Sequence, residues 1–294
     1  MQLFFQHVID AITLGSSYAL YALGIALIFG IMRLINFAYG ELIMVGAYML
    51  VFIGNVPWPV QVLATVGIAV VFALAMERAA FRPLRGANPA TLLISSFAVS
   101  YGLQNLAILI EGSAPKGINV STWLSESITI GSITITHLAI VTIATTFGLL
   151  VALGLFLSRT RIGVQMRAAA EDFRMARILG VRADTVIATS FAISGLFAGL
   201  GAYFLVAQTG EVAPDIGSQP VLYAFVATVL GGMGSLRGAV LGAYVFAGVT
   251  VALQATLPGS LASYRDAFAF GAVIVILLFR PQGLIVAPSV VTRV

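Results

Sequence analysis

The sequence contains no cysteine and little charge. Without cysteine the protein can form no disulfide, no thiolate metal site and no cysteine nucleophile. Charged residues make up only 9% of the 294 residues, whereas a soluble domain usually carries about 25%. So few charges cannot cover a surface that faces water, and lipid must therefore solvate most of the exterior.

Histidine and lysine are also scarce. The two histidines, His7 and His137, are far apart in the sequence, which argues against a histidine metal site. A P-loop ATPase needs a glycine-rich loop that ends in Gly-Lys-Ser or Gly-Lys-Thr, but the single lysine, Lys116, precedes Gly117 and Ile118. This chain therefore cannot bind ATP by that route. No nucleophile is paired with a base, so we expect no catalytic residue, no metal, no cofactor and no enzymatic activity.

Apolar residues dominate what remains. They make up 60% of the chain, and the mean hydropathy is +1.05. Within lipid every backbone N–H and C=O must be bonded internally, which leaves helices or closed barrels. Barrel strands would alternate in polarity over about 10 residues, and the long apolar runs show no such alternation. The sequence predicts an all-α, polytopic membrane bundle that forms a single transmembrane domain over residues 1–294.

We expect eight or nine spans. They cover residues 8–30, 34–54, 60–77, 90–110, 137–158, 186–208, 219–235, 239–257 and 263–279. Two of these segments are interrupted. Polar residues lie near the start of 34–54, and glycines crowd the end of 219–235.

The arginines predict the orientation. They cluster at span ends, at Arg78, Arg82, Arg85, Arg159, Arg161, Arg167, Arg174, Arg177, Arg182, Arg237 and Arg280. By the positive-inside rule these ends are cytoplasmic. Nine spans then place the N-terminus outside and the C-terminus inside. The same clustering accounts for the net charge of +4 without a nucleic-acid partner.

The longest charged stretch covers residues 159–185, on the predicted cytoplasmic side. Apolar residues fall roughly on one side at helical spacing, namely Met166, Ala169 (or Ala170), Phe173, Ala176 and Ile178. Gly180 then suits a helix C-terminus. The pattern predicts a short amphipathic helix outside the membrane. Either it is a solvated loop that only enforces topology, or it is a docking helix that transmits force from a cytoplasmic partner.

Ionisable residues within spans are costly and tend to mark pathways. Glu41 follows Gly40 and Asn36, which could cap a helix, so we predict a break between two half-helices. Free N–H groups at such a helix start could bind a carboxylate, and Glu41 could attract an ammonium group. Alternatively, Glu41 only stabilises a first helical turn at the cytoplasmic interface. Gln104 and Asn105 are further pathway candidates, although interhelical hydrogen bonds explain them equally well.

Two local patterns predict packing and turns. Residues 127–136 alternate polar and β-branched residues and predict a small hairpin around Gly131. Gly195, Gly199 and Gly201 have the small-residue spacing that permits close helix packing.

Several phrases resemble a known family. Ala170-Glu171-Asp172, followed by Ala176 and Gly180, resembles the loop by which permeases of ATP-binding cassette importers engage their ATPases. Four further phrases resemble the branched-chain amino acid permease family, and its LivH-type subunit in particular. They are Asn36-Phe-Ala-Tyr-Gly-Glu41, Arg82-Pro-Leu-Arg-Gly86, Val229-Leu-Gly-Gly-Met-Gly-Ser-Leu-Arg-Gly-Ala239 and Phe279-Arg-Pro-Gln-Gly-Leu284. The resemblance runs from about residue 8 to 285. Tyr39 departs from the family pattern, which has histidine there.

The resemblance implies a permease subunit of an ATP-driven importer in a bacterial inner membrane, carrying branched-chain or similar small apolar amino acids. It also implies four kinds of partner: a second, homologous permease subunit in a heterodimer, two ATPase subunits, a periplasmic solute-binding protein and the bilayer itself. The alternative is a secondary transporter or channel for a small polar solute such as urea or an amide. Ion coupling would then require more intramembrane charge than Glu41 supplies.

Overall fold

The computed structural model describes residues 2–54, 56–84, 86–130 and 133–285, and most of them are helical. Within these ranges, seven helices are long and apolar enough to cross a bilayer, as expected for the predicted polytopic bundle. They are built from α1 (Gln2–Met32), α3 (Trp58–Met76), α4 (Pro89–Glu111), α6 (His137–Arg159), α9 (Ala183–Thr209), α11 (Leu236–Thr256) and α12 (Arg265–Phe279). A π-helix, Glu77–Phe81, extends α3, and a 3₁₀ helix, Gly259–Tyr264, precedes α12.

Two further apolar helices are too short to cross by themselves. They are α2 (Tyr39–Ile53), with 15 residues, and α10 (Ser218–Gly231), with 14. At about 1.5 Å per residue, each is about 8 Å shorter than a hydrocarbon core of about 30 Å. These helices occupy the two predicted spans that the sequence interrupts. All nine predicted segments are thus helical, and two of them are reduced in length.

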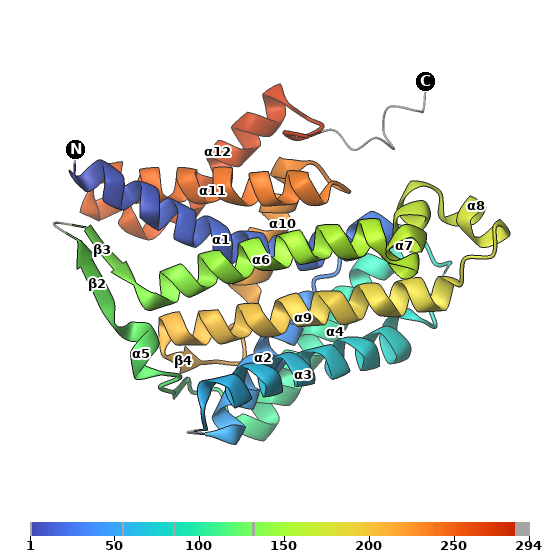
Figure 1. Ribbon diagram of the computed structural model, residues 1–294, viewed down its shortest axis with the longest axis horizontal. Coiled ribbons are helices and arrows are strands. Elements are labelled where there is room, and N and C mark those ends of the chain that lie inside the picture. The colour runs from blue at the N-terminus through green and yellow to red at the C-terminus, as the bar shows by residue number, and fades with distance from the viewer. Residues whose placement is uncertain (1, 55, 85, 131–132, 286–294) are drawn as a thin grey trace.

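Most of the long helices run roughly side by side, α12 is inclined to them, and α10 lies behind α6 and α9 in Figure 1. Helix α1 packs against α6, α9, α10 and α11. In the 18-residue apolar stretch of α1, 83% of the residues are buried, whereas in the corresponding stretches of α4 and α12 only 11% are buried. The core therefore surrounds α1, and α4 and α12 expose most of their surface to lipid or to another subunit.

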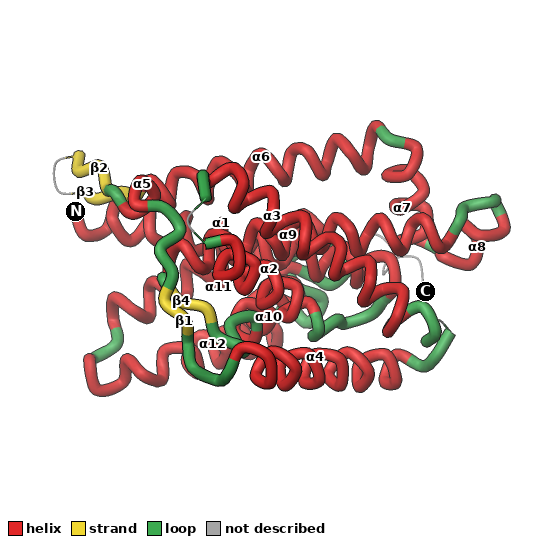
Figure 2. Tube along the Cα trace, turned by 90° about the horizontal axis from the view of Figure 1, so that it is seen from below, coloured by secondary structure: helices red, strands yellow, loops and turns green. Residues whose placement is uncertain are grey.

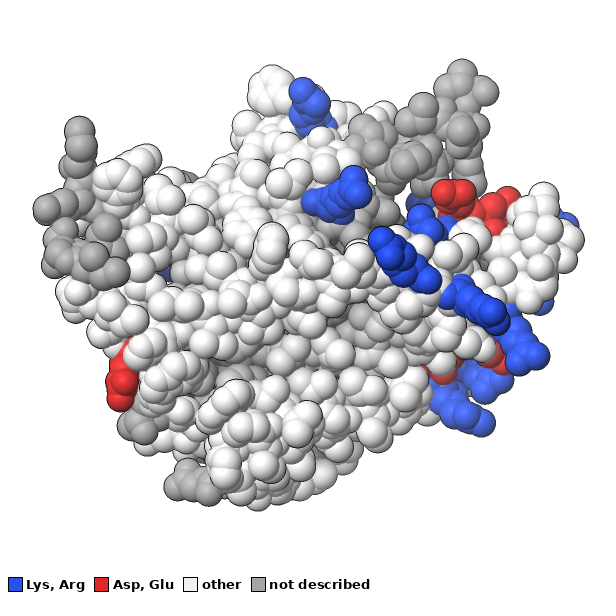
Figure 3. Space-filling model, viewed as in Figure 1, with Lys and Arg blue, Asp and Glu red and all other residues white. Residues whose placement is uncertain are grey.

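The two ends of the bundle differ in charge. The short helices α7 (Arg161–Glu171) and α8 (Phe173–Ile178) project at one end, and the N-terminus lies at the other (Figure 1). Most of the Lys and Arg visible in Figure 3 gather toward the α7–α8 end. The positive-inside rule makes this the cytoplasmic end. Arg85 lies outside the described residues.

The opposite, outer end carries the short β-strands, which are yellow in Figure 2. Strand β2 (Ser127–Ile130) pairs antiparallel with β3 (Ile133–Thr136), which confirms the predicted hairpin, and its turn at Gly131 lies outside the described residues. A four-residue helix, α5 (Thr122–Ser125), precedes it. Strand β1 (Lys116–Gly117) pairs with β4 (Glu211–Val212). Two-residue strands carry no periodicity, so the sequence did not predict this pair.

Glycines allow α9 to lie directly against α3. A Cβ added at Gly195 would lie 2.8 Å from the Ala69 carbonyl oxygen, and one at Gly199 would lie 2.7 Å from the Val66 Cα. The backbones themselves are therefore in contact, which confirms the close packing predicted from the spacing of these glycines.

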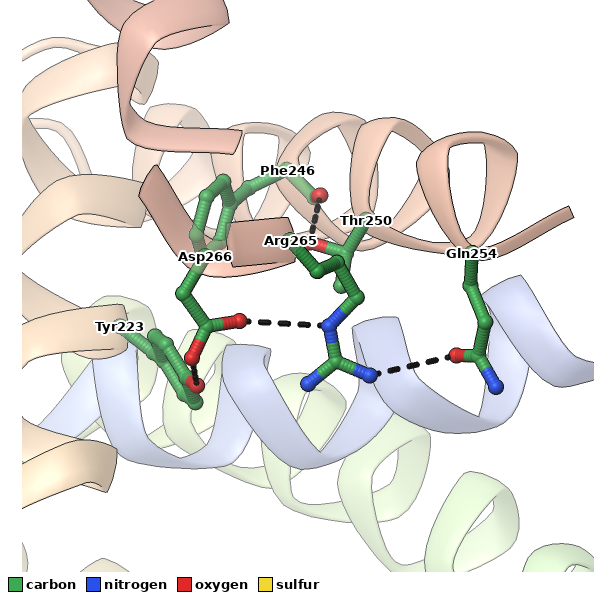
Figure 4. Close-up of polar contacts among 6 residues, drawn as sticks. All are labelled: Tyr223, Phe246, Thr250, Gln254, Arg265 and Asp266. Atoms are coloured by element: carbon green, nitrogen blue, oxygen red, sulfur yellow. Dashed lines mark hydrogen bonds and ion pairs between the residues drawn. The ribbon is translucent and has the colours of Figure 1, made fainter. Parts of the chain in front are cut away.

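A polar network joins α12 to α10 and α11 near the start of α12 (Figure 4). The Tyr223 hydroxyl donates to Asp266 Oδ2 at 2.7 Å, and Arg265 Nε donates to Asp266 Oδ1 at 3.3 Å. Arg265 Nη1 also donates to Gln254 Oε1 at 3.4 Å. Because α12 buries little apolar surface, these contacts define where its first turn attaches to the bundle.

We expect Gly199→Ala to destabilise the protein by about 1–3 kcal/mol, because the methyl group meets immovable backbone atoms of α3. Thermal unfolding in detergent measures the effect. Gly67→Ala, on α3, is the matched control, since no atom lies within 4 Å of its added Cβ. Equal midpoints for the two variants would contradict the proposed backbone contact.

Candidate functional site

A non-helical segment, residues 33–38, separates α1 from α2 inside the protein. Arg33 has φ 55°, in the left-handed region that ends the helix. Three side chains of the segment, Leu34, Asn36 and Ala38, are buried. The Phe37 N–H donates to Ser96 Oγ at 3.3 Å, and the same hydroxyl lies 3.4 Å from the Ile35 carbonyl oxygen. Helix α4 thus supplies hydrogen bonds that lipid could not provide.

Glu41 lies in the first turn of α2 and is 1% exposed. Its Oε1 accepts from Ser100 Oγ at 2.7 Å and from Gln104 Nε2 at 2.9 Å. Gln104 also donates to Ser218 Oγ at 3.2 Å. Ser100 is the central residue of α4. Glu41 therefore lies level with the middle of α4 and away from both ends of that helix.

The residues that contact this region from α4 form a stripe. Ser96, Ser100 and Gln104 are spaced by four residues and share one helix face. The sequence reasoning missed both serines, although this spacing was a usable signal. Asn105 lies outside the stripe. It is exposed, and its Nδ2 donates to the Tyr101 carbonyl at 2.7 Å within its own helix.

The starts of the two short helices meet next to Glu41. A Cβ added at Gly40, the second residue of α2, would lie 2.7 Å from the carbonyl oxygen of Gly217, which precedes α10. Ser218, the first residue of α10, accepts a hydrogen bond from Gln104, which also donates to Glu41. We call Glu41, Ser100, Gln104 and Ser218 the Glu41 cluster. Only the fold brings residues 40 and 218 together, so the sequence could not identify Ser218.

Most backbone donors identified at these helix starts are already bonded. The amides of Gly40 and Glu41 donate to the carbonyls of Phe37 and Ala38, at 3.4 and 3.2 Å, and the Ser218 amide donates to Asp215 at 2.9 Å. Asn36 does not cap α2 with its side chain, since the N-cap residue is Ala38. The prediction that Asn36 caps the helix, and that free N–H groups of its first residues await a carboxylate, is therefore wrong.

Unpaired side-chain atoms occur in the stretch from residue 36 to residue 41. Four of its buried polar atoms have no hydrogen-bond partner among the described residues: Asn36 Oδ1 and Nδ2, the Tyr39 hydroxyl and Glu41 Oε2. The Tyr39 ring is fully buried and packs against Gly24, where an added Cβ would lie 2.6 Å from Tyr39 Cζ. Buried polar groups nearly always bond to something, including water or a ligand. These three side chains are therefore the strongest candidates for contact with a solute.

At the cytoplasmic end the structure has two helices where one was predicted. Asp172 ends α7 and caps α8, because its Oδ1 accepts from the Met175 N–H at 2.9 Å. Ala176 is buried, and Gly180, with φ 87°, turns the chain in the left-handed region. An aspartate favours a helix start over a helix interior, which explains the break.

The end of α8 exposes apolar side chains. Met175, Ile178 and Leu179 are 53, 72 and 78% exposed, although Ile178 was predicted on the apolar face. Ala170 is half-buried, and Glu171 is exposed beside them in the chain. Exposed apolar groups outside the spans are typical of a protein-binding surface. We call residues 170–180 the docking tip.

A separate cavity of about 660 Å³ opens at the outer end. Polar side chains of α1, α9 and α11 line it, including Gln6, Asp10, Gln208 and Gln254. Glu41, Ser100, Gln104 and Ser218 do not line this cavity. The outer cavity and the Glu41 cluster are therefore distinct features.

A polytopic helical bundle with broken spans, an enclosed polar cluster level with the middle of α4 and a protruding cytoplasmic tip has the architecture of a transport permease. The family model for the branched-chain amino acid transport system / permease component matches residues 7–278, and the chain belongs to that family. It is 36% identical to the high-affinity branched-chain amino acid transport system permease protein BraD of Pseudomonas aeruginosa, over 98% of this chain and 97% of BraD. It is 35% identical to the corresponding permease protein LivH of Escherichia coli, with the same coverage.

We expect Gly40→Ala to separate the starts of α2 and α10 and to lower stability by about 1–3 kcal/mol, because its Cβ meets the Gly217 backbone. Gly102→Ala on α4 is the control, with open space around its added Cβ. Thermal unfolding measures both. A Gly40→Ala midpoint that matches Gly102→Ala would contradict the tight approach.

Proposed function

We propose that the chain is the membrane-spanning permease subunit of an ATP-binding cassette importer for branched-chain or similar small apolar amino acids. The observation that carries this proposal is similarity along almost the whole chain to permease proteins named for high-affinity branched-chain amino acid transport. The bacterial inner membrane is the expected location. The chain itself is non-catalytic, and separate subunits hydrolyse ATP.

The docking tip is the proposed contact for the two ATPase subunits. Ala170, Glu171, Asp172, Ala176 and Gly180 carry the resemblance to coupling loops, and the exposed Met175, Ile178 and Leu179 offer apolar surface to a partner. Helix α7 packs against α1 and α9. A force on the tip is thereby passed to the most buried helix of the bundle, which suits a switch between inward-facing and outward-facing states.

The proposed translocation pathway passes the Glu41 cluster. Asn36, Gly40, Glu41 and Gln104 lie where α2 and α10 begin, and α4 covers them. Asn105 belongs to the pathway only if solute also contacts the exposed face of α4. Because only 11% of the residues in the apolar stretch of α4 are buried, α4 can shift with modest loss of packing. Its movement would uncover Glu41.

Two further partners complete the proposed importer. A solute-binding protein docks at the outer end and delivers the amino acid. A second, homologous permease subunit forms a heterodimer with this chain, and the exposed faces of α4 and α12 are the surfaces available to it. Family resemblance supports both partners.

A secondary transporter or channel for urea or an amide is the less favoured function. Its coupling would rely on ionisable groups along the spans, and it would have no use for a docking tip. Co-purification separates the two functions, because a tagged importer subunit brings down ATPases and a secondary transporter does not.

We expect Glu171→Lys combined with Gly180→Trp to reduce ATPase co-purification and amino-acid uptake about tenfold or more, since charge and bulk at the docking tip oppose docking. Glu211→Lys, at an exposed position on the outer end, is the charge-reversal control and should leave ATPase co-purification unchanged. Normal uptake by the docking-tip variant would refute the importer function.

A further inference from the structure

The Glu41 carboxylate is satisfied on one side only. Oε1 accepts two hydrogen bonds, from Ser100 and Gln104, whereas Oε2 is buried and has no partner in the part of the chain that the structure describes. Among the described residues, no Arg or Lys forms an ion pair with Glu41. A buried charge without a counterion is strongly unfavourable, so the free oxygen is suited to a positively charged group that arrives from elsewhere.

A second pair of unpaired atoms, one acceptor and one donor, belongs to the segment that leads into α2. Asn36 is 1% exposed and leaves both its Oδ1 and its Nδ2 unbonded, five residues before Glu41. A bare metal cation could use carboxylate and carbonyl oxygens, but it would leave the Asn36 Nδ2 donor unsatisfied. A molecule with a cation next to an anion satisfies both kinds of group.

Every α-amino acid has an ammonium group and a carboxylate on one carbon. We propose that Glu41 Oε2 receives the ammonium group of the transported amino acid and that the Asn36 amide binds its carboxylate. The inference rests on the proposed importer function and refines it, because it assigns specificity for zwitterionic amino acids over urea and neutral amides. The backbone amides at the start of α2 are already bonded, so they do not compete for the carboxylate.

The roles of the surrounding residues follow from their contacts. Ser100 and Gln104 hold Oε1 and so orient Oε2, and Gln104 links the carboxylate to the start of α10 through Ser218. These are positioning residues. Because α4 carries both donors, a shift of α4 would release the carboxylate and alter its hold on the ammonium group.

The test compares Glu41→Gln with Glu41→Asp in the complete importer, reconstituted in proteoliposomes with ATP. The measured quantity is the number of leucine molecules taken up per ATP hydrolysed. Gln keeps the size and the Oε1 acceptor but loses the charge, whereas Asp keeps the charge and loses a methylene. We expect Gln to lower the ratio about tenfold or more and Asp to retain more uptake than Gln.

A purely structural role predicts the reverse order, because Gln is the closer isostere, and that order would overturn the inference. An unchanged ratio in Glu41→Gln would overturn it too, since the orphan atoms would then bind only water. Ser95→Ala is the control on α4, as Ser95 is half-buried and, among the described residues, its hydroxyl donates to the Thr91 carbonyl oxygen of its own helix. Absence of ATP-driven leucine uptake in the unaltered complex would instead refute the proposed function itself.

Discussion

The need to bond every backbone amide within the hydrocarbon constrains this structure more than any other factor. Long helices meet it internally, but the segment between α1 and α2 does not. It is tolerated because protein buries it and because Ser96 of α4 contacts backbone groups of Ile35 and Phe37. The Phe37 ring also stacks on Phe97 of α4, with ring centroids 4.2 Å apart. The break, and with it the position of Glu41, therefore depends on α4.

This dependence gives α4 a double character. Its outer surface is among the least buried of the spans, yet its inner face supplies the polar groups that Glu41 needs. Polar bonds in a medium of low dielectric constant are strong when complete and costly when broken. An element held by a few such bonds has discrete positions, which suits a moving part better than a broad apolar interface does.

Close packing at glycines restricts the movement of α9 against α3. At Gly195 and Gly199, which are about one helical turn apart, α9 lies on the backbone of α3, and contacts of this kind leave little freedom to slide. Helices α1, α3 and α9 thus form the rigid part of the bundle. Because α7 contacts α1 and α9, motion at the docking tip reaches this rigid part directly.

Composition and periodicity were enough to predict the class of fold, the nine helical segments, the charged cytoplasmic end and the hairpin at residues 127–136. These features depend on the free energy of transfer into lipid and on local spacing, both of which are written along the chain. The sequence also singled out Glu41, since a carboxylate within an apolar run is rare enough to notice.

The surroundings of Glu41 required the tertiary structure. Ser100, Gln104 and Ser218 come from two other helices, up to 177 positions away in the chain, and no local pattern encodes which helix faces which. Likewise, the division of the charged stretch at Asp172 reflects a competition between capping and helix propagation. The sequence by itself determined which segments enter the membrane, because that is decided residue by residue by hydrophobicity. Only the tertiary structure decided which buried polar atoms are bonded and which remain free, because hydrogen bonding depends on distances between segments.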